Sequence, residues 1–233
     1  MAPDGPLDFD DDPEGRGAAG RRQAQPTARL PAAGASRHGW LVGGVGVLVA
    51  VVIALNAFGS PERGPRGLTA GGAAPPFAAP LALSRLDGDV NVAVKAGSGD
   101  AGAVPACSIR RPDVLNLCAL YEQGPVVLAF FAARGEECVE QLDALDAAAA
   151  RHPDVRFAAV SIRGDRDALR RLIRDRRWRF EVAYDRDGIL ADAYGVAACP
   201  QVAYLRRGGA VQATSLGALS AADLEARVRR LER

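Results

Sequence analysis

From residue 124 of the 233-residue chain onward, the pattern of apolar and polar positions predicts a regular alternation of strands and helices. Residues 126–131 form a continuous apolar run, as expected of a strand that is buried on both faces of a sheet. In residues 136–151, apolar side chains recur at helical spacing, which predicts a helix with one buried face. The two patterns then alternate along the chain: strand 155–162, helix 165–177, strand 180–184, helix 189–194, strands 201–205 and 210–216, and helix 220–231. This order predicts an α/β fold with a central mixed sheet and helices on both of its faces.

Short local motifs refine these elements. Ser220 and Asp223 form a capping-box pattern at the start of the last helix. Gly208 and Gly209 stand between the last two strands and predict a hairpin turn. Earlier in the chain, alternating apolar residues on both sides of an Asp-Gly pair predict another hairpin over residues 81–94.

A long apolar run near the N-terminus predicts a membrane anchor. Residues 40–58 are apolar except for Asn56, and nineteen residues in a helix extend about 28 Å, close to the hydrocarbon thickness of a bilayer. We assign residues 38–58 to one transmembrane helix, because a cleaved signal peptide would need a very long n-region and has a poor cleavage site here. Arginines are more frequent before the run than after it, which predicts an N-terminus inside and a C-terminal domain outside the cytoplasmic membrane.

The sequence on either side of this run predicts no packed core. Residues 1–37 are rich in Pro, Gly, Ala and charged residues, which is typical of a disordered cytoplasmic tail. Residues 59–74 are rich in Gly, Pro and Ala and are expected to form a flexible linker. The folded domain is therefore expected to span residues 75–233.

The composition argues against several classes of function. The formal net charge is +1, so the chain lacks the basic excess typical of nucleic-acid-binding proteins. His38 and His152 are the only histidines and lie far apart, and no zinc-type cysteine pattern is present, so no metal site is expected. No P-loop occurs either. The sequence therefore predicts neither a cofactor nor a metal.

The order of elements and two motifs resemble the thioredoxin superfamily. The closest branch is that of the membrane-anchored redoxins, which include thiol-disulfide oxidoreductases and alkyl-hydroperoxide-reductase-like proteins. In that family a strand leads into a helix through the pattern F-x-A-x-W-C-x-x-C, whose last eight positions correspond to residues 131–138, FAARGEEC. Cys138 thus takes the position of the second cysteine and Gly135 that of the first. Residues 195–200, GVAACP, resemble the family's loop that ends in a cis-proline, here Pro200.

The resemblance implies that the residue before the cis-proline, Cys199, faces Cys138. Thiol-disulfide exchange needs an attacking thiolate and a second thiol that resolves the mixed disulfide. Because Gly135 replaces the family's attacking cysteine, we expect Cys138 and Cys199 to form an alternative redox pair, with Pro200 completing the site. Protein thiols or disulfides would be the substrates.

Other interpretations of Cys138 and Cys199 stay open. The two cysteines could form a static disulfide or remain inert buried thiols, in a degenerate redoxin that serves as a binding or scaffold module of the cell envelope. Peroxide reduction by Cys138 is a further alternative, but peroxiredoxins carry Thr or Ser three residues before the reactive cysteine and Gly135 stands there. The chain could thus be a thiol-disulfide oxidoreductase, and a peroxidase is the weaker prediction.

Cys107 and Cys118 precede the first core strand and have no general counterpart in the family. In an oxidising compartment they are expected to form a structural disulfide that closes a short loop. A second redox pair that passes electrons to Cys138 and Cys199 is the alternative.

Overall fold

The computed structural model describes residues 44–49, 51, 67–97 and 102–233. The chain divides into two units, Met1–Gly59 and Ser60–Arg233, and the described residues of the first unit are helical and exposed. Apart from those residues, the predicted transmembrane segment 38–58 lies outside the described residues, as do the predicted tail 1–37 and about half of the predicted linker. None of the helices in the described part combines the length and the hydropathy that a membrane crossing requires.

The second unit is built on a five-stranded sheet in the order β5-β4-β3-β6-β7. The strands are β3 (Val126–Phe131), β4 (Arg156–Ile162), β5 (Glu181–Asp185), β6 (Gln201–Leu205) and β7 (Val211–Leu216). The first three are parallel, whereas β6 runs antiparallel to β3 and β7 antiparallel to β6. The prediction of a mixed sheet is therefore confirmed.

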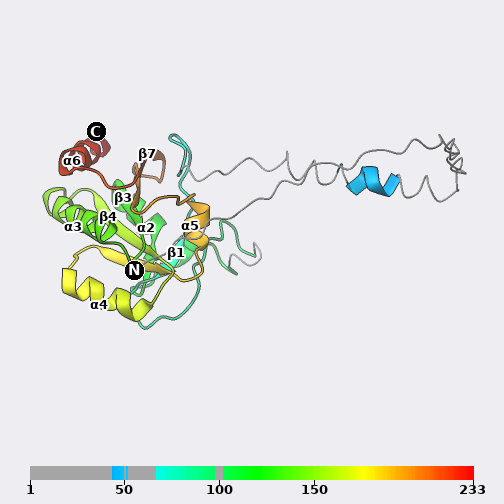
Figure 1. Ribbon diagram of the computed structural model, residues 1–233, viewed down its shortest axis with the longest axis horizontal. Coiled ribbons are helices and arrows are strands. Elements are labelled where there is room, and N and C mark those ends of the chain that lie inside the picture. The colour runs from blue at the N-terminus through cyan, green and yellow to red at the C-terminus, as the bar shows by residue number, and fades with distance from the viewer. Residues whose placement is uncertain (1–43, 50, 52–66, 98–101) are drawn as a thin grey trace, which may run out of the picture. The chain divides into compact units, whose positions relative to one another are not determined.

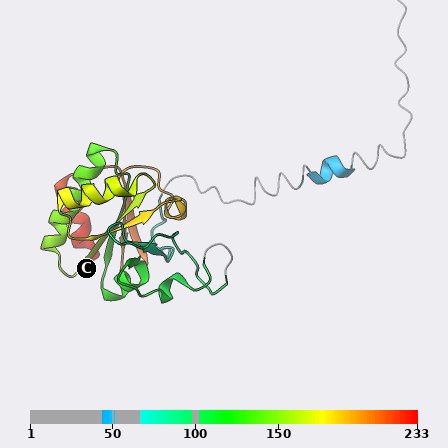
Figure 2. The same cartoon turned by 90° about the horizontal axis from the view of Figure 1, so that it is seen from below.

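Helices cover both faces of this sheet (Figures 1 and 2). All six side chains of β3 are buried, and alternate residues enter two separate apolar clusters on opposite faces. On the first face pack α3 (Glu136–Arg151), α4 (Arg166–Arg176) and α6 (Ala221–Leu231). On the second face pack α2 (Leu117–Gln123), α5 (Ile189–Ala193) and a small sheet of β1 (Ala78–Pro80) and β2 (Val114–Asn116).

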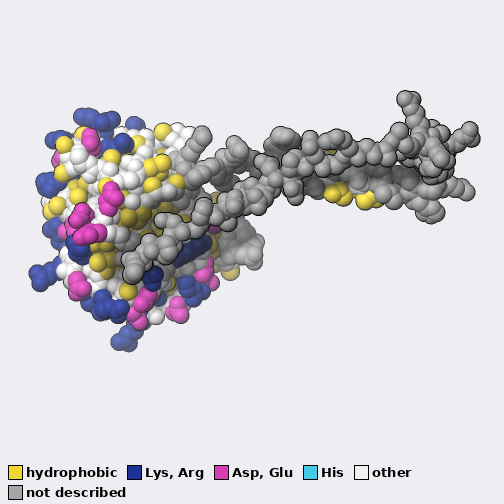
Figure 3. All heavy atoms as spheres, in the orientation of Figure 1, with side chains coloured by type: hydrophobic (Ala, Val, Ile, Leu, Met, Phe, Trp, Pro, Cys, Tyr) yellow, Lys and Arg dark blue, Asp and Glu magenta, His cyan; other side chains and the backbone are white. Residues whose placement is uncertain are grey.

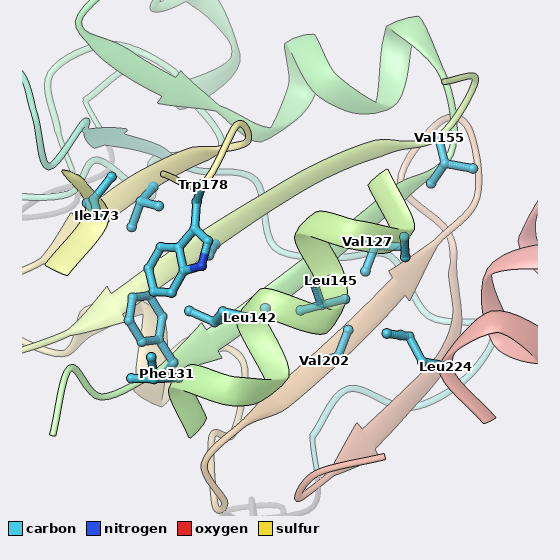
Figure 4. Close-up of a cluster of buried hydrophobic side chains, with 14 of the residues drawn as sticks. Val127, Phe131, Leu142, Leu145, Val155, Ile173, Trp178, Val202 and Leu224 are labelled. Carbon is cyan, nitrogen blue, oxygen red and sulfur yellow. The ribbon is translucent and has the colours of Figure 1, made fainter. Parts of the chain in front are cut away.

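The cluster on the first face fixes the end of β3. Figure 4 shows Phe131, the last residue of β3, beside Leu142 of α3 and the indole of Trp178. The rings of Phe131 and Trp178 meet edge to face with their centroids 5.8 Å apart, a favoured aromatic geometry. Trp178 Nε1 also donates a hydrogen bond of 2.7 Å to Asp143 of α3. Both polar and apolar contacts thus hold the strand that leads into the 131–138 motif.

The predicted hairpin over residues 81–94 is wrong. β1 pairs with β2 instead, Asn91 forms a bridge with Ala78 of β1, and Leu81 forms a bridge with Ala183 of β5. Residues 81–86 lie against α4, where their carbonyl oxygens accept hydrogen bonds from Arg166 and Arg170. Ala82 N also donates to Val182 O on the edge strand β5. These contacts satisfy the backbone groups that a hairpin would otherwise pair.

Basic and acidic side chains are interspersed on the face of the domain shown in Figure 3. Several form surface ion pairs, including Arg179–Asp146 at 2.8 Å and Arg176–Asp143 at 2.7 Å, which attach the end of α4 and the segment after it to α3. Such exposed pairs contribute little stability individually. The mixed charge on this face agrees with the formal net charge of +1.

One buried ionic cluster joins the end of α3 to α6. His152, which ends α3, is only 7% exposed, and its two ring nitrogens lie 2.8 Å from Glu232 Oε1 and 2.9 Å from Glu225 Oε1. Because both ring nitrogens face carboxylates, the doubly protonated imidazolium satisfies both contacts. Burial alone would lower the pKa of His152, but the hydrogen bonds to Glu232 and Glu225 outweigh it and raise that pKa above its usual 6.5.

We expect the stabilisation from His152 to be largest in mild acid. A histidine whose pKa is raised by folding contributes its full stability below the unfolded pKa of about 6.5 and loses it as the pH rises through the folded pKa. The melting temperature of His152→Gln should therefore fall below that of the wild type by more at about pH 5.5 than at about pH 8.5. A gap that stays constant, or that widens with rising pH, would contradict this assignment.

Candidate redox site

The first half of the site is the start of α3, directly after β3. Gly135 caps the helix with φ 155° and ψ 110°, a backbone conformation that favours glycine. Cys138 is the third residue of α3 and is 7% exposed. Its sulfur therefore lies in the first turn of the helix, where the positive end of the helix dipole favours a thiolate.

The second half is the loop between α5 and β6, which carries Cys199 and Pro200. The Cys199–Pro200 peptide bond is cis, as the resemblance implied. The buried side chain of Gln201 holds this loop, because its Oε1 accepts from Ala197 N and its Nε2 donates to Tyr194 O, both at 3.1 Å. We therefore identify Gln201 as a positioning residue that the sequence analysis missed. A polar residue at the start of an otherwise apolar strand was the available signal.

The sheet brings the two halves together. Strands β3 and β6 are antiparallel neighbours, with Phe130 opposite Gln201, so the residues that follow β3 and those that precede β6 meet at one edge. There Cys138 and Cys199 form a disulfide with a Cα–Cα distance of 5.6 Å across 61 residues of sequence. This distance lies within the range typical of disulfides. Pro200 is buried beside the pair, and its carbonyl accepts a hydrogen bond of 2.8 Å from Gly217 N.

The polar contact to the disulfide comes from the backbone. Ala132 N, just after β3, donates to Cys199 Sγ at 3.2 Å. The neighbouring charged side chains Glu136 and Glu137 are exposed. Arg134 is also exposed. The pKa of Asp165 is lowered mostly by backbone N–H groups, and the charges of Arg171 and Arg134 make smaller contributions. The hydrogen bond to Cys199 therefore comes from a backbone donor rather than from a charged side chain.

The second disulfide belongs to a different part of the domain. Cys107 and Cys118 are joined with a Cα–Cα distance of 5.3 Å, and Cys118 lies in α2, on the face of the sheet opposite to α3. Asn116 Nδ2 ties the closed loop by donating to Ala106 O at 2.8 Å and Ile109 O at 2.7 Å. Since the two disulfides pack on opposite faces, the geometry favours a structural role for Cys107–Cys118. All four cysteines of the chain are therefore paired.

The site contains side chains for sulfur chemistry and little else. Among the described residues, no three His, Cys, Asp or Glu side chains gather as they would around a metal ion. The pair of sulfurs, the cis-proline and the Ala132 N–H together can support formation and cleavage of a disulfide bond.

Gly135→Cys is expected to divert Cys138 from Cys199. A Cβ added at Gly135 would lie 3.4 Å from Cys138 Sγ, so a thiol there could reach the same sulfur. We expect peptide mapping by mass spectrometry without reduction to detect a disulfide between positions 135 and 138 beside the original pair. The substitution should also cost about 1–3 kcal/mol because it places a side chain at φ 155°.

Gly135→Ala is the matched control, since it carries the same backbone strain without a thiol. It should lose comparable stability and keep Cys138 paired with Cys199 alone. If Gly135→Cys also kept that pairing alone, position 135 would not compete for Cys138.

Comparison with known proteins gives one family and a set of structural neighbours. A model of the AhpC/TSA family matches residues 114–214. A structure assigned as the thiol:disulfide interchange protein DsbE from Chlorobium tepidum is 19% identical, with a TM-score of 0.55 over 71% of this chain and 99% of that chain. A structure assigned as a protein disulfide isomerase from Bacteroides thetaiotaomicron is 12% identical, with a TM-score of 0.53 over 71% and 91% of the two chains.

An uncharacterized conserved protein from Geobacillus kaustophilus is 16% identical, with a TM-score of 0.52 over 70% of this chain and 82% of that chain. At such identities these neighbours show a shared fold. The search of curated proteins found no significant match.

Proposed function

We propose that the chain is a redoxin of the thioredoxin superfamily, as the AhpC/TSA family model over residues 114–214 and the shared fold support, and that it carries out thiol-disulfide exchange through Cys138 and Cys199. Its substrates are thiols or disulfides of other proteins. The domain works on the outer side of the cytoplasmic membrane, and a single transmembrane helix over residues 38–58 anchors it with the N-terminus inside.

The observation that carries the exchange function is the disulfide between Cys138 and Cys199 beside a cis-proline. A disulfide can exchange only if an incoming thiolate reaches one of its sulfurs. Cys199 is only half-buried and lies on a loop that carries the exposed Ala197, which supports access to this pair. The neighbour from Chlorobium tepidum, assigned to thiol:disulfide interchange, supports the same class of reaction.

Two features support the proposed location. All four cysteines are paired, which suits an oxidising compartment outside the cytoplasm. The apolar run over residues 40–58 has the length of a membrane span, and arginines are more frequent before it than after it. Protease added to intact spheroplasts should therefore digest the C-terminal domain. Protection of the domain until the membrane is disrupted would overturn the location.

A redox titration tests the exchange function. The full chain is equilibrated across a series of glutathione redox buffers, and each cysteine pair is followed by alkylation and mass spectrometry. We expect Cys138–Cys199 to titrate reversibly within about −120 to −270 mV, the range of exchange proteins, while Cys107–Cys118 in the same molecule stays oxidised. A potential of Cys138–Cys199 below about −300 mV would instead indicate a static disulfide in a non-catalytic module.

A further inference from the structure

The geometry points to Cys199 as the sulfur that exchanges with the partner, and to Cys138 as the buried cysteine that resolves the mixed disulfide; this inference rests on the proposed exchange function. In the family pattern the attacking cysteine occupies the position of Gly135, on the same helix as the resolving cysteine. Here the attacking role passes to a different loop, across the site.

Accessibility separates the two sulfurs. Cys138 is 7% exposed, because its side chain lies in the first turn of α3 against the domain. Cys199 is half-buried, and the loop before it contains the exposed Ala197 and half-buried Ala198. Because an incoming thiolate must approach one sulfur along the line of the disulfide bond, access decides which sulfur is attacked. Cys199 is the more exposed residue of the two, and we assign the attack to its sulfur.

The hydrogen bond from Ala132 supports the same assignment. Ala132 N donates to Cys199 Sγ at 3.2 Å and keeps a donor in place for the thiolate that forms when the disulfide opens. A sulfur held this way is a good leaving group from a mixed disulfide, because a stabilised thiolate leaves faster. The first turn of α3 supplies the corresponding stabilisation for Cys138.

A substrate protein with two thiols can be oxidised in two successive exchange steps, each of which releases one of the two stabilised thiolates. The first substrate thiolate attacks Cys199 Sγ, the Cys138–Cys199 bond breaks, and Cys138 leaves as a thiolate that takes up a proton. The second substrate thiolate then attacks the substrate sulfur of the mixed disulfide and expels Cys199 as a thiolate. The substrate is oxidised by two electrons to a disulfide, and the protein is reduced to a dithiol.

The reverse direction uses the same roles. The Cys199 thiolate attacks a substrate disulfide and forms the mixed disulfide, and one substrate thiol leaves. The Cys138 thiolate then attacks Cys199 Sγ, which restores the disulfide seen in the structure and releases the second substrate thiol. In both directions the covalent intermediate is on Cys199.

Single-cysteine variants test this assignment in the full chain. Cys138→Ser and Cys199→Ser are each incubated with oxidised glutathione, and formation of the mixed disulfide is followed by mass spectrometry. We expect Cys138→Ser, which retains Cys199, to react at least about tenfold faster than Cys199→Ser. The same two variants in denaturant should react at similar rates, because the difference depends on folded access and on the Ala132 N–H.

A measurement on the wild-type protein tests the same assignment without requiring that the variants fold. The oxidised protein is mixed with glutathione, quenched with acid, and digested, and the glutathionylated cysteine is identified by peptide mapping. We expect the adduct on Cys199. An adduct predominantly on Cys138, or equal rates for the two folded variants, would overturn the assignment.

These outcomes are separate from failure of the proposed function. If the adduct forms on Cys138 while the pair titrates reversibly in the exchange range, the exchange function stands and the roles are reversed. If the pair has a potential below about −300 mV but the adduct still forms on Cys199, the role of Cys199 as the accessible sulfur stands and the exchange function fails.

Discussion

Replacing Cys199 by serine is expected to reduce multi-turnover thiol-disulfide exchange to the uncatalysed rate. The reason is that Cys138 and Cys199 form one disulfide, and a cycle that opens and re-forms it needs both sulfurs. The remaining Cys138 is only 7% exposed and sits beside Gly135, so no second thiol lies at the position that the family uses for attack. The measurement is the oxidation of a dithiol peptide under repeated turnover, with oxidised glutathione as the oxidant that re-forms the protein's disulfide, followed by mass spectrometry.

The matched control is the variant Cys107→Ala with Cys118→Ala, which also removes one disulfide. Because that disulfide lies on the opposite face of the sheet, the control should keep its exchange rate at a temperature where it remains folded. Wild-type turnover by Cys199→Ser, or loss of turnover in the control alone, would move the exchange reaction to the other pair.

The sheet and helices after residue 124 could be predicted because their patterns are local. The apolar run of 126–131 marks a strand buried on both faces, and the structure places it in the centre of the sheet as β3. The predicted cap at the start of α6 is also local, and Ser220 Oγ accepts a hydrogen bond of 3.1 Å from Asp223 N. Each of these features depends on neighbours within a few residues.

The segment before β3 could not be predicted because long-range contacts determine it. Strands β1 and β2 are three residues each, too short to show a period of their own. Within the alternating pattern of residues 81–94, Leu83 and Val94 are 52% and 67% exposed, so these two positions do not belong to a buried face. Arginines 80 to 88 residues further along the chain donate hydrogen bonds to the carbonyl oxygens of residues 81–86.

The site was predicted only in part, and for a different reason. The pairing of Cys138 with Cys199 came from the resemblance, since a separation of 61 residues gives no information about contact by itself. The hydrogen bond from Ala132 N has no signature in the sequence, because every residue except proline carries the same donor. The chemical roles of the two sulfurs depend on such contacts and on burial, and therefore needed the structure.

Removal of the Cys107–Cys118 disulfide by double substitution with alanine is expected to destabilise the domain by about 3 kcal/mol. The two cysteines are eleven residues apart, and closing a loop of this length restricts the unfolded chain by roughly that amount. The melting temperature should fall by roughly 6–12 °C, given about 2–4 °C per kcal/mol for a domain of this size. Thermal unfolding of the oxidised proteins, monitored by circular dichroism, provides the measurement.

Substitution of both Cys138 and Cys199 by alanine distinguishes two estimates of the lost stability, one from the length of the closed loop and one from the reduction potential of the disulfide. Loop length alone predicts a larger loss there, about 4 kcal/mol, because the closed segment spans 61 residues. If Cys138–Cys199 is redox-active, the two variants should rank the other way in lost stability. A disulfide with a higher reduction potential stabilises the fold less, and a difference of about 100 mV corresponds to about 4.6 kcal/mol. We therefore expect the Cys138→Ala, Cys199→Ala variant to lose less stability than the Cys107→Ala, Cys118→Ala variant. The order given by loop length would instead identify Cys138–Cys199 as a second structural disulfide.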